Sequence, residues 1–267
     1  MSDTVNVLNS IVTRTRQRIE AKKREVPPEK VIEAAGQKMI SYDFPFEKAL
    51  KRDDIAFICE IKRASPSQGT LTDDFRYLDI AIEYQNAGAA AISVLTEPYY
   101  FRGSDRCLTE ISNAVSIPVL RKDFVVDEYM IYESKVLGAD AVLLICRVLD
   151  TDTLRRCIDI AHRLGMSALV ETHNASEIRS AIDAGARVIG VNNRDLNSLK
   201  TDFSTTLRLR ALVPREKIFV SESGIGCSGE INTLRDIQAD AVLIGGALMC
   251  CSDRTNEIMR LRGDPRA

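Results

Sequence analysis

Residues 137–146 read LGADAVLLIC, and this stretch decides the fold. Its Gly-Ala pair is typical of a helix C-terminus, where a left-handed residue ends the helix and the chain turns into a strand. The apolar run that follows, at 141–146, is short and rich in β-formers, as in a buried strand. A similar signal recurs as a weak internal repeat, which predicts alternating helices and strands: NAGAAAI from 86, DAGARVI from 183 and QADAVLI from 238.

Eight runs of this kind occur along the chain, and each gap between them is long enough for a helix and two loops. Eight strand and helix units fit a closed (β/α)8 TIM barrel, a fold with a typical length of about 250 residues. An open doubly wound parallel sheet is the structural alternative. The candidate strands are IAFICEI from Ile55, AAAISVL from Ala89, IPVLRKD from Ile117, AVLLIC from Ala141, SALVE from Ser167, VIGVNN from Val188, IFVSES from Ile218 and AVLIGG from Ala241.

The segment before the first strand is a candidate N-terminal helical extension. We expect one α/β barrel domain over residues 1–267, of which 1–48 form this extension. The stretch from Val5 to Arg24 has the pattern of an amphipathic helix, and the Pro27-Pro28 pair breaks it. We expect this helix to cap one end of the barrel; the alternative is a loosely packed arm.

Composition excludes several classes of protein. Lys and Arg number 36 against 38 Asp and Glu, a net charge of −2, and no basic stripe suits a nucleic-acid backbone. The seven cysteines include no CxxC pair, and only His162 and His173 could join them as ligands, which favours reduced thiols over disulfides or a zinc site. The N-terminus is too polar for a signal peptide, and the apolar runs are too short to cross a bilayer. We therefore expect a cytoplasmic protein that binds neither membrane nor nucleic acid.

Polar residues gather at the ends of the predicted strands. In a parallel barrel the binding groups sit at the C-terminal ends of the strands. Because side chains alternate along a strand, period-two spacing predicts which of them share a face. One such charge is usually a solvated loop residue, but several converging at one barrel mouth shift pKa values and favour chemistry. The pairs are Glu60 with Lys62, Leu120 with Lys122, Leu169 with Glu171, and Asn192 with Arg194.

Glycines follow the seventh and eighth candidate strands, in ESGIG from Glu222 and IGG from Ile244. In this fold, backbone N–H groups at these loops, together with the start of a short helix, commonly hold a phosphate. Arg194 could add a charge-assisted contact. The alternative is that the glycines only make tight turns.

Eight ordered segments, one after another on the strand ends, resemble the indole-3-glycerol-phosphate synthase family of tryptophan biosynthesis. With the N-terminal helix they span nearly the whole chain. ESGI alone would be a weak match, whereas the ordered set is specific. The segments are CEIKRASPSQG from Cys59, SVLTEPYYFRGS from Ser93, VLRKDFVVDEY from Val119, LLI from Leu143, LVETH from Leu169, GVNNRDL from Gly190, VSESGI from Val220 and LIGGALM from Leu243.

The resemblance implies an activity and catalytic residues. The family converts 1-(2-carboxyphenylamino)-1-deoxyribulose 5-phosphate into indole-3-glycerol phosphate, with release of carbon dioxide and water, and no metal or organic cofactor is implied. Ring closure requires a proton at the ketone oxygen, which is work for a positioned ammonium. By resemblance Lys122 is this acid and Glu171 the base. Glu60 and Lys62 match the first-strand pair, with Lys62 neutralising the substrate anion and Glu60 holding or relaying protons.

Binding positions follow from the same resemblance. Ser65 and Asn192 match substrate-orienting residues, and Phe101, Phe124 and Leu143 match an apolar slot for the anthranilate ring, for which ordinary core packing is the alternative. Two positions depart from the pattern: Gln68 stands where relatives often carry Lys, and Gly246 replaces a larger polar residue. The phosphate grip matches Arg194, Ser223, Gly224, Gly245 and Gly246.

Two other functions stay open at this point. Another phosphate-binding barrel enzyme, such as a phosphoribosyl or sugar-phosphate isomerase, would also use Arg194, Ser223 and the paired glycines. A non-enzymatic binding protein is harder to reconcile with the intact Lys122 and Glu171. We expect a monomer with a small phosphorylated substrate as its partner, and the sequence does not indicate whether pathway enzymes associate with it.

Overall fold

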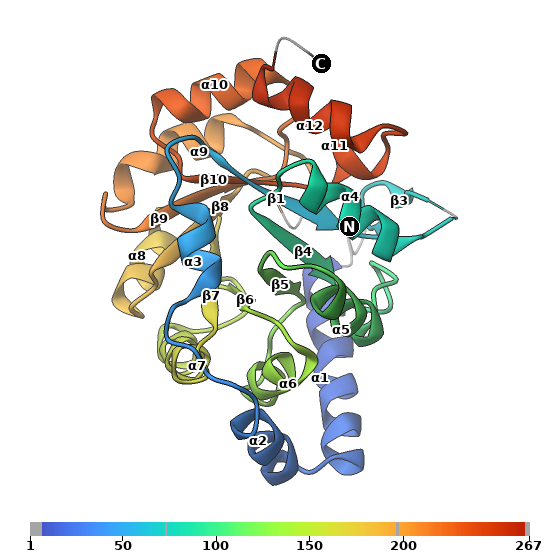
Figure 1. Ribbon diagram of the computed structural model, residues 1–267. Helices are drawn as coiled ribbons and strands as arrows, with labels where there is room; N and C mark the ends of the chain where they lie inside the picture. Colours follow the sequence, from blue (N-terminus) through green and yellow to red (C-terminus); the bar gives the residue numbers. More distant parts are fainter. Residues whose placement is uncertain (1–6, 73, 196–197, 265–267) are drawn as a thin grey trace, which may run out of the picture.

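Eight parallel strands close into a barrel (Figure 1) in a computed structural model that describes residues 7–72, 74–195 and 198–264. The strand order is β1-β10-β9-β8-β7-β6-β5-β4, and β1 pairs with both β10 and β4. The predicted TIM barrel is confirmed, and the open sheet is wrong because the sheet has no free edge. The strands are β1 (Ala56–Ile61), β4 (Ala91–Leu95), β5 (Val119–Lys122), β6 (Ala141–Ile145), β7 (Ser167–Thr172), β8 (Val188–Asn192), β9 (Ile218–Glu222) and β10 (Ala241–Ile244).

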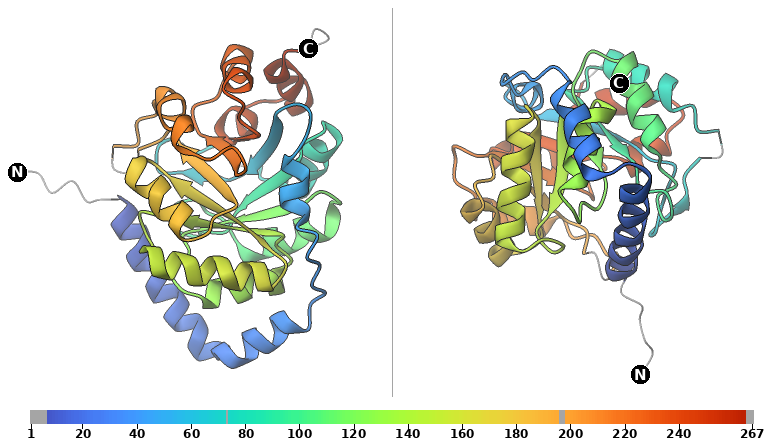
Figure 2. Two further views of the ribbon diagram at one scale, coloured as in Figure 1. Left: turned by 90° about the vertical axis from the view of Figure 1, so that its left-hand side faces the viewer. Right: turned by 90° about the horizontal axis from the view of Figure 1, so that it is seen from below.

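Helices surround the barrel, as the two further views show (Figure 2). Helix α7 illustrates why: Leu154, Cys157, Ile158 and Ala161 recur at spacings of three and four, and all are buried against the strands. The helices after β1 are α4 (Tyr77–Asn86), α5 (Asp105–Ala114), α6 (Tyr129–Leu137), α7 (Thr151–Arg163), α8 (Ala175–Asp183), α9 (Ser204–Leu209) with η1 (Arg210–Leu212), α10 (Ser228–Asp236), α11 (Gly246–Met249) and α12 (Arg254–Arg262).

The predicted helix ends take left-handed backbone conformations. Gly88, Gly138 and Gly185 have φ values of 82°, 93° and 86° just after α4, α6 and α8. Gln238 occupies the same place after α10 with a φ of 56°, although it carries a side chain. The internal repeat therefore marks one recurring helix-to-strand turn, and position 238 adopts it without glycine.

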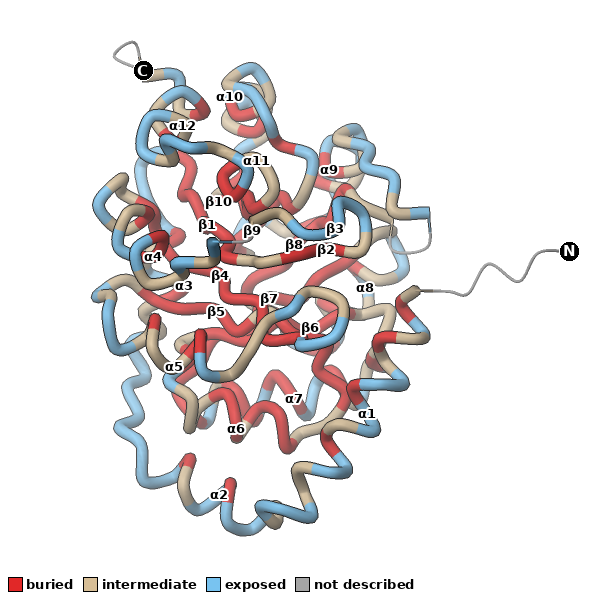
Figure 3. Tube along the Cα trace, turned by 90° about the vertical axis from the view of Figure 1, so that its right-hand side faces the viewer, coloured by how far each residue is buried: buried red, intermediate tan, exposed pale blue. Residues whose placement is uncertain are grey.

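Strand alternation separates two hydrophobic clusters. Ile58, Leu120 and Leu169 belong to the cluster inside the barrel, whereas Phe57 and Val170 belong to the cluster between the strands and the helices. Figure 3 shows the strands of the barrel as almost entirely buried. The predicted inward face is thus confirmed, and the next inward residues along these strands are the candidate site residues.

The N-terminal helix α1 (Val7–Glu25) is packed against the barrel, so the loose arm is wrong. It buries Leu8, Ile11 and Ile19, and the Arg18 guanidinium binds the buried Asp123 carboxylate at 2.8 and 2.9 Å, just past β5. The predicted helix began at Val5, which lies outside the described residues. After the Pro27-Pro28 break, α2 (Pro28–Gly36) packs against α6.

Helix α3 (Pro45–Leu50) closes the opposite end of the barrel. Phe46 and Leu50 are fully buried in the inner cluster. The Glu47 carboxylate accepts a hydrogen bond from the Ser167 hydroxyl at 3.1 Å and pairs with Arg187 at 2.7 Å, both at the N-terminal side of their strands. The C-terminal end of the barrel is therefore the end left for a binding site.

The loop after β1 contains a short antiparallel hairpin that the sequence did not predict. It pairs β2 (Ala64–Ser65) with β3 (Gly69–Thr70). Neither strand is long enough to give a periodic signal.

Within residues 7–72, 74–195 and 198–264, no helix combines the length and apolar character needed to span a bilayer.

Candidate active site

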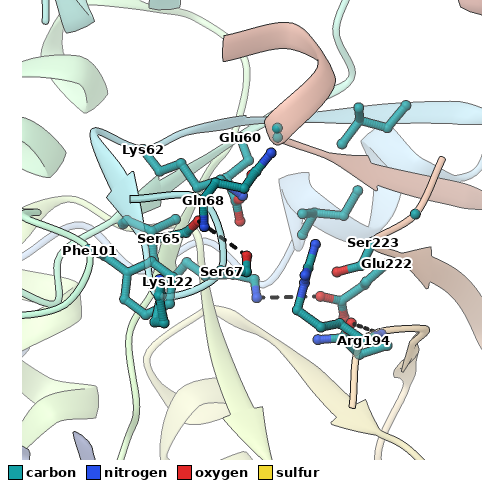
Figure 4. A pocket seen from close by; sticks show the side chains of 18 of the residues that line it. Glu60, Lys62, Ser65, Ser67, Gln68, Phe101, Lys122, Arg194, Glu222 and Ser223 are labelled. Carbon is teal, nitrogen blue, oxygen red and sulfur yellow. Dashed lines mark hydrogen bonds and ion pairs between the residues drawn. The ribbon is translucent and has the colours of Figure 1, made fainter. Parts of the chain in front are cut away.

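One cavity of about 460 Å³ opens at the C-terminal end of the barrel strands. Its size suits a small organic ligand, since such pockets commonly measure about 300–1,000 Å³. Side chains from separate strands reach it, as Figure 4 shows for Glu60, Lys122 and Glu222. All the site residues predicted from the sequence line this one cavity: Glu60, Lys62, Ser65, Phe101, Lys122, Phe124, Leu143, Glu171, Asn192, Arg194, Ser223, Gly224, Gly245 and Gly246.

Glu60 and Lys62 form an ion pair on the inner face of β1. The Lys62 ammonium lies 2.6 Å from the Glu60 carboxylate. Burial by itself would raise the pKa of Glu60, but Lys62 and Lys122 outweigh it and lower that pKa. A Cβ at Gly245 would overlap both the Glu60 carboxylate and the Lys62 ammonium. One requirement for glycine at 245 is therefore steric and comes from this pair.

The Lys122 ammonium lies between two carboxyl groups. It donates to Glu171 at 3.3 Å and lies 3.4 Å from Glu222. Burial would lower the pKa of Lys122, yet the charges of Glu171, Glu222 and Glu60 outweigh burial and raise that pKa. Lys122 is therefore a charged ammonium that several carboxyl groups hold in place.

The two carboxyl groups beside Lys122 differ in protonation. Burial raises the pKa of both, but for Glu171 the cations of Lys122 and His173 and a hydrogen bond from Asn192 outweigh it, so its pKa is lowered. For Glu222, burial dominates, Glu171 and Glu60 add repulsion, and the pKa rises to about 8. At neutral pH the site thus contains an ionised carboxylate, Glu171, and a neutral carboxyl group, Glu222, beside one ammonium.

Glu222 was not among the predicted site residues, although it ends β9 and lines the cavity. The signal that could have found it is the alternation used for Glu171: Val220 belongs to the inner cluster, so the residue two positions later also faces inward. The neighbouring Ser223-Gly224 pair drew the interpretation of this segment towards phosphate binding. Gly190 leaves room for Glu222, because a Cβ there would overlap its carboxyl group.

The apolar part of the cavity contains Phe101 and Phe124, whose ring centroids lie 5.9 Å apart at a 38° tilt. Leu143 lies on the same lining. Helix α1 also contributes Leu8 and Ile11, which sequence reasoning did not assign to the site. The slot is therefore built partly by the extension, and only tertiary packing could reveal this.

The opposite part of the cavity combines a guanidinium with backbone turns. Burial lowers the pKa of Arg194, and Glu60 opposes this. Ser223 and Gly224 are both left-handed, with φ values of 66° and 74°. The Asn193 amide donates to the Ser223 carbonyl at 2.9 Å and so holds this strained turn. A cationic side chain and a fixed turn after β9 suit an anion.

The two departures from the family pattern lie against each other. A Cβ at Gly246 would be 3.0 Å from the Gln68 side-chain oxygen. The space that a larger residue would take at 246 is thus occupied by the Gln68 amide. Ser65 holds the same loop, since its hydroxyl accepts a hydrogen bond from the Gln68 backbone N–H at 3.2 Å.

No group of three or more His, Cys, Asp or Glu residues is arranged to hold a metal ion in the part of the chain that the structure describes. The polar residues of the cavity instead make ion pairs with one another, such as Glu60 with Lys62 and Lys122 with Glu171. These pairs supply proton donors and acceptors at the mouth of the barrel.

Comparison with known proteins gives one consistent result. The family described as indole-3-glycerol phosphate synthase matches residues 8–261. A protein of that name from Ruminiclostridium cellulolyticum is 51% identical over 257 residues, covering 96% of this chain and 99% of the relative. Another from Endomicrobium trichonymphae is 49% identical over 256 residues, with the same coverage of 96% and 99%.

Solved structures share the barrel at low sequence identity. The 3-hexulose-6-phosphate synthase from Salmonella typhimurium superposes with a TM-score of 0.64 at 17% identity, covering 78% of this chain and 97% of that one. A mutant tryptophan synthase alpha-subunit from Pyrococcus furiosus gives 0.60 at 14% identity, with coverage of 79% and 98%. These likenesses bear on the fold alone.

Proposed function

The chain belongs to the indole-3-glycerol phosphate synthase family, and from that premise we propose which of its residues perform each step of the reaction. As a member of this family it is a carboxy-lyase of tryptophan biosynthesis that acts on a small phosphorylated substrate. The reaction closes a ring onto a ketone, releases carbon dioxide and then eliminates water. Each of these steps moves charge or a proton at a different atom.

Lys122 is the acid of the ring closure. As the aromatic carbon attacks the ketone, negative charge develops on the ketone oxygen, and a nearby ammonium can both stabilise and protonate it. The support is the charged state of Lys122, held by Glu171 at 3.3 Å and Glu222 at 3.4 Å. Such a pre-positioned donor needs no reorganisation during the step.

Glu171 is the base of the elimination. Once carbon dioxide has left, the hydroxyl departs and a proton is lost from the new ring, so an acid and a base are needed together. The lowered pKa of Glu171, which follows from the Lys122 and His173 cations despite burial, leaves its carboxylate free to take that proton. Lys122, 3.3 Å away, is the acid for the departing hydroxyl once it has taken up a proton from solvent to replace the one given to the ketone oxygen.

Glu222 keeps the charge of the site in balance. Three carboxyl groups face two ammonium groups, and the group with the pKa of about 8 holds a proton at neutral pH. Glu60 and Lys62 form the second pair, in which Lys62 neutralises the substrate anion and Glu60 holds or relays a proton.

The substrate lies across the cavity with its ring and its phosphate at opposite parts. Phe101, Phe124 and Leu143 receive the anthranilate ring, while Ser65 and Asn192 orient the groups between. The tilted contact of the two phenyl rings supports an aromatic occupant. The phosphate is held by Arg194 and by the backbone N–H groups of Ser223, Gly224, Gly245 and Gly246.

The 3.3 Å contact between Lys122 and Glu171 inside the cavity carries the assignment of Lys122 as the acid and Glu171 as the base. Measuring carbon dioxide release and indole formation separately in each variant tests it. With the purified protein we expect carbon dioxide and the indole product in equal amounts, the indole product being measured by its fluorescence. Glu171→Gln should still release carbon dioxide in the first turnover but form little indole product, whereas Lys122→Met should release neither. Normal indole formation by Glu171→Gln would remove the assigned base.

We further propose that the protein works as a monomer in the cytoplasm and that the N-terminal extension folds as part of the barrel domain over its described residues, 7–48; residues 1–6 of the predicted extension lie outside the described residues. The burial of Leu8 and Ile11 in the inner cluster, and of Phe46 at its other end, supports a single folding unit. Sedimentation at working concentration tests the oligomeric state, and a single unfolding transition tests the domain organisation.

A further inference from the structure

His173 lies directly behind the proposed base. It follows Glu171 by two positions at the end of β7, and its side chain is only 5% exposed. Its Nε2 lies 3.4 Å from the Glu171 carboxylate, and its Nδ1 lies 3.0 Å from the Glu177 carboxylate on α8. The imidazole therefore bridges two carboxyl groups, one of which lines the cavity.

Glu177 is a rigid anchor for this ring. Its carboxylate accepts hydrogen bonds from the His173 backbone N–H at 2.8 Å and from the Asn174 amide at 2.7 Å, in the first turn of α8. Asn174 in return caps the helix by accepting from the Glu177 N–H at 3.0 Å. Arg147 lies 3.5 Å from the same carboxylate. The ring position is thus fixed by a helix terminus outside the cavity.

The two contacts together favour a proton on each ring nitrogen. Nδ1 must donate to Glu177, because the carboxylate can only accept. The buried Nε2 makes no hydrogen bond to any described residue, and the nearest charge it meets is the ionised Glu171 carboxylate at 3.4 Å, an ion-pair distance at which a lone pair on Nε2 would be repelled. A proton on Nε2 turns the repulsion into attraction.

We propose that His173 is a positioning residue for the base: a doubly protonated imidazole, held by Glu177, that orients the Glu171 carboxylate and keeps it ionised. The inference rests on the proposed function only where it names Glu171 as the base. His173 is not itself one of the residues that line the cavity, and it acts through Glu171, which is.

The surrounding charges favour this state. Burial would lower the pKa of His173, but the hydrogen bond and charge of Glu177 and the charge of Glu171 outweigh it, with Arg147 opposing, and the pKa is raised. Cys146 is a neutral neighbour, because burial raises its pKa to about 12. The charged or titratable groups around the Glu171–His173 pair are Glu60, Lys122, Cys146, Arg147, Glu177 and Glu222, and Arg147 also pairs with Asp195 at 3.5 Å.

The chain provides its own internal control, since it has only two histidines. His162 lies against the Phe44 ring at 5.7 Å, and burial together with Arg187 lowers its pKa to about 4. Nitrogen NMR of protein labelled at histidine should therefore show one imidazolium and one neutral ring at pH 7.5. An ordinary histidine would be only about one-tenth protonated there. Two neutral rings would overturn the proposal, and His162→Gln assigns the signals.

Removing either carboxylate tests which contacts hold the proton. Glu171→Gln and Glu177→Gln should each move the His173 titration to lower pH by about one unit. Neither measurement depends on turnover, so it stands even if the proposed function fails. An unchanged titration in both variants would contradict the bridging arrangement.

The pH profile of kcat/KM tests the effect on the base. Because His173 lowers the pKa of Glu171, His173→Gln should move the acidic limb to higher pH by about one unit, a loss of about tenfold on that limb. His173→Lys, which keeps a cation, should restore the profile, and His162→Gln should match the wild type. Absence of turnover in the wild type would remove the proposed function. Wild-type turnover with a His173→Gln profile that superimposes on it would remove only the role of His173.

Discussion

The carboxyl group of Glu222, which is almost completely buried, lies 3.4 Å from the Lys122 ammonium. The contact is an ion pair only when Glu222 has lost its proton, and its pKa of about 8 means that it keeps the proton at neutral pH. The contact therefore changes from a neutral carboxyl group beside an ammonium into an ion pair as the pH rises one or two units above neutrality.

Glu222→Gln should make the protein more stable at pH 8 than the wild type. The folded-state pKa of Glu222 is raised above the ordinary value of 4.5, so the native state binds more protons than the unfolded state between these values. The wild type therefore loses stability as pH rises towards 8, at up to about 1.4 kcal/mol per unit. Urea unfolding at pH 6, 7 and 8 should give a flatter dependence for the variant, while exposed Glu216→Gln follows the wild type. Equal slopes for Glu222→Gln and wild type would contradict the raised pKa.

The same variant tests whether Glu222 transfers a proton. A neutral amide replaces a neutral acid at pH 7, so we expect turnover within about tenfold of the wild type. A loss of more than about a hundredfold would assign Glu222 a proton-transfer role, given the usual size of general acid–base contributions.

Arg18→Ala should loosen α1 and weaken substrate binding. It would remove one of the two guanidinium groups beside the fully buried Asp123. Arg121 at 3.6 Å and the Thr96 hydroxyl, which donates to Asp123 at 2.7 Å, remain, so we expect a loss of up to about 3 kcal/mol of unfolding free energy. Since α1 contributes Leu8 to the slot, KM should rise more than kcat falls. Arg16→Ala, on the exposed face of the same helix, should change neither value. An unchanged KM in Arg18→Ala would contradict the contribution of α1 to substrate binding.

Gly190→Ala should damage the site through Glu222. The added Cβ would overlap the Glu222 carboxyl group and approach Leu169 at 3.2 Å, so we expect about 1–3 kcal/mol of destabilisation and a clear loss of kcat. Gly36→Ala provides the matched control, because nothing lies within 4 Å of its Cβ and it sits in the last turn of α2. The control should be neutral or slightly stabilising, and a fully active Gly190→Ala would contradict the close approach.

Gln238→Gly should stabilise the protein by up to about 1 kcal/mol. Gln238 has a φ of 56° at the turn where α4, α6, α7 and α8 use glycine, and a side chain in that conformation costs about 1–2 kcal/mol. The extra freedom of glycine in the unfolded chain offsets part of the gain. Thermal unfolding measures the difference. A lower Tm for the variant would show that the Gln238 side chain contributes contacts that outweigh the strain.

The barrel and most of the cavity lining follow from alternation in the sequence. Leu169 and Glu171 share a face because side chains alternate along a strand. A closed barrel turns that face towards the barrel axis. Inward residues at the strand ends therefore lie close together, and the loop conformations are not needed to predict this. The same rule applies to Glu222. Its neighbours Ser223 and Gly224 match a phosphate-binding motif, however, and the segment is interpreted from that motif and not from the position of Glu222 on the strand.

Other parts depend on contacts that no local pattern encodes. Leu8 and Leu143 line the same cavity although three barrel strands, β1, β4 and β5, lie between them in the sequence. An amphipathic pattern shows only that α1 packs against something, not where. Likewise, the spacing of His173 and Glu177 indicates a helix start, but the ring orientation that joins Glu171 to Glu177 depends on burial and on the turn after β7.

Lys122→Met gives the most direct test of the account, because it removes the ammonium and keeps a similar shape. Turnover and product binding should separate: kcat should fall by about 10²–10⁴-fold, while the Kd for indole-3-glycerol phosphate, measured by calorimetry, stays within about threefold. Lys48→Met, an exposed lysine paired only with Asp43, should change neither. A Lys122→Met variant with kcat within threefold of the wild type would contradict the central claim that this ammonium is the acid of the ring closure.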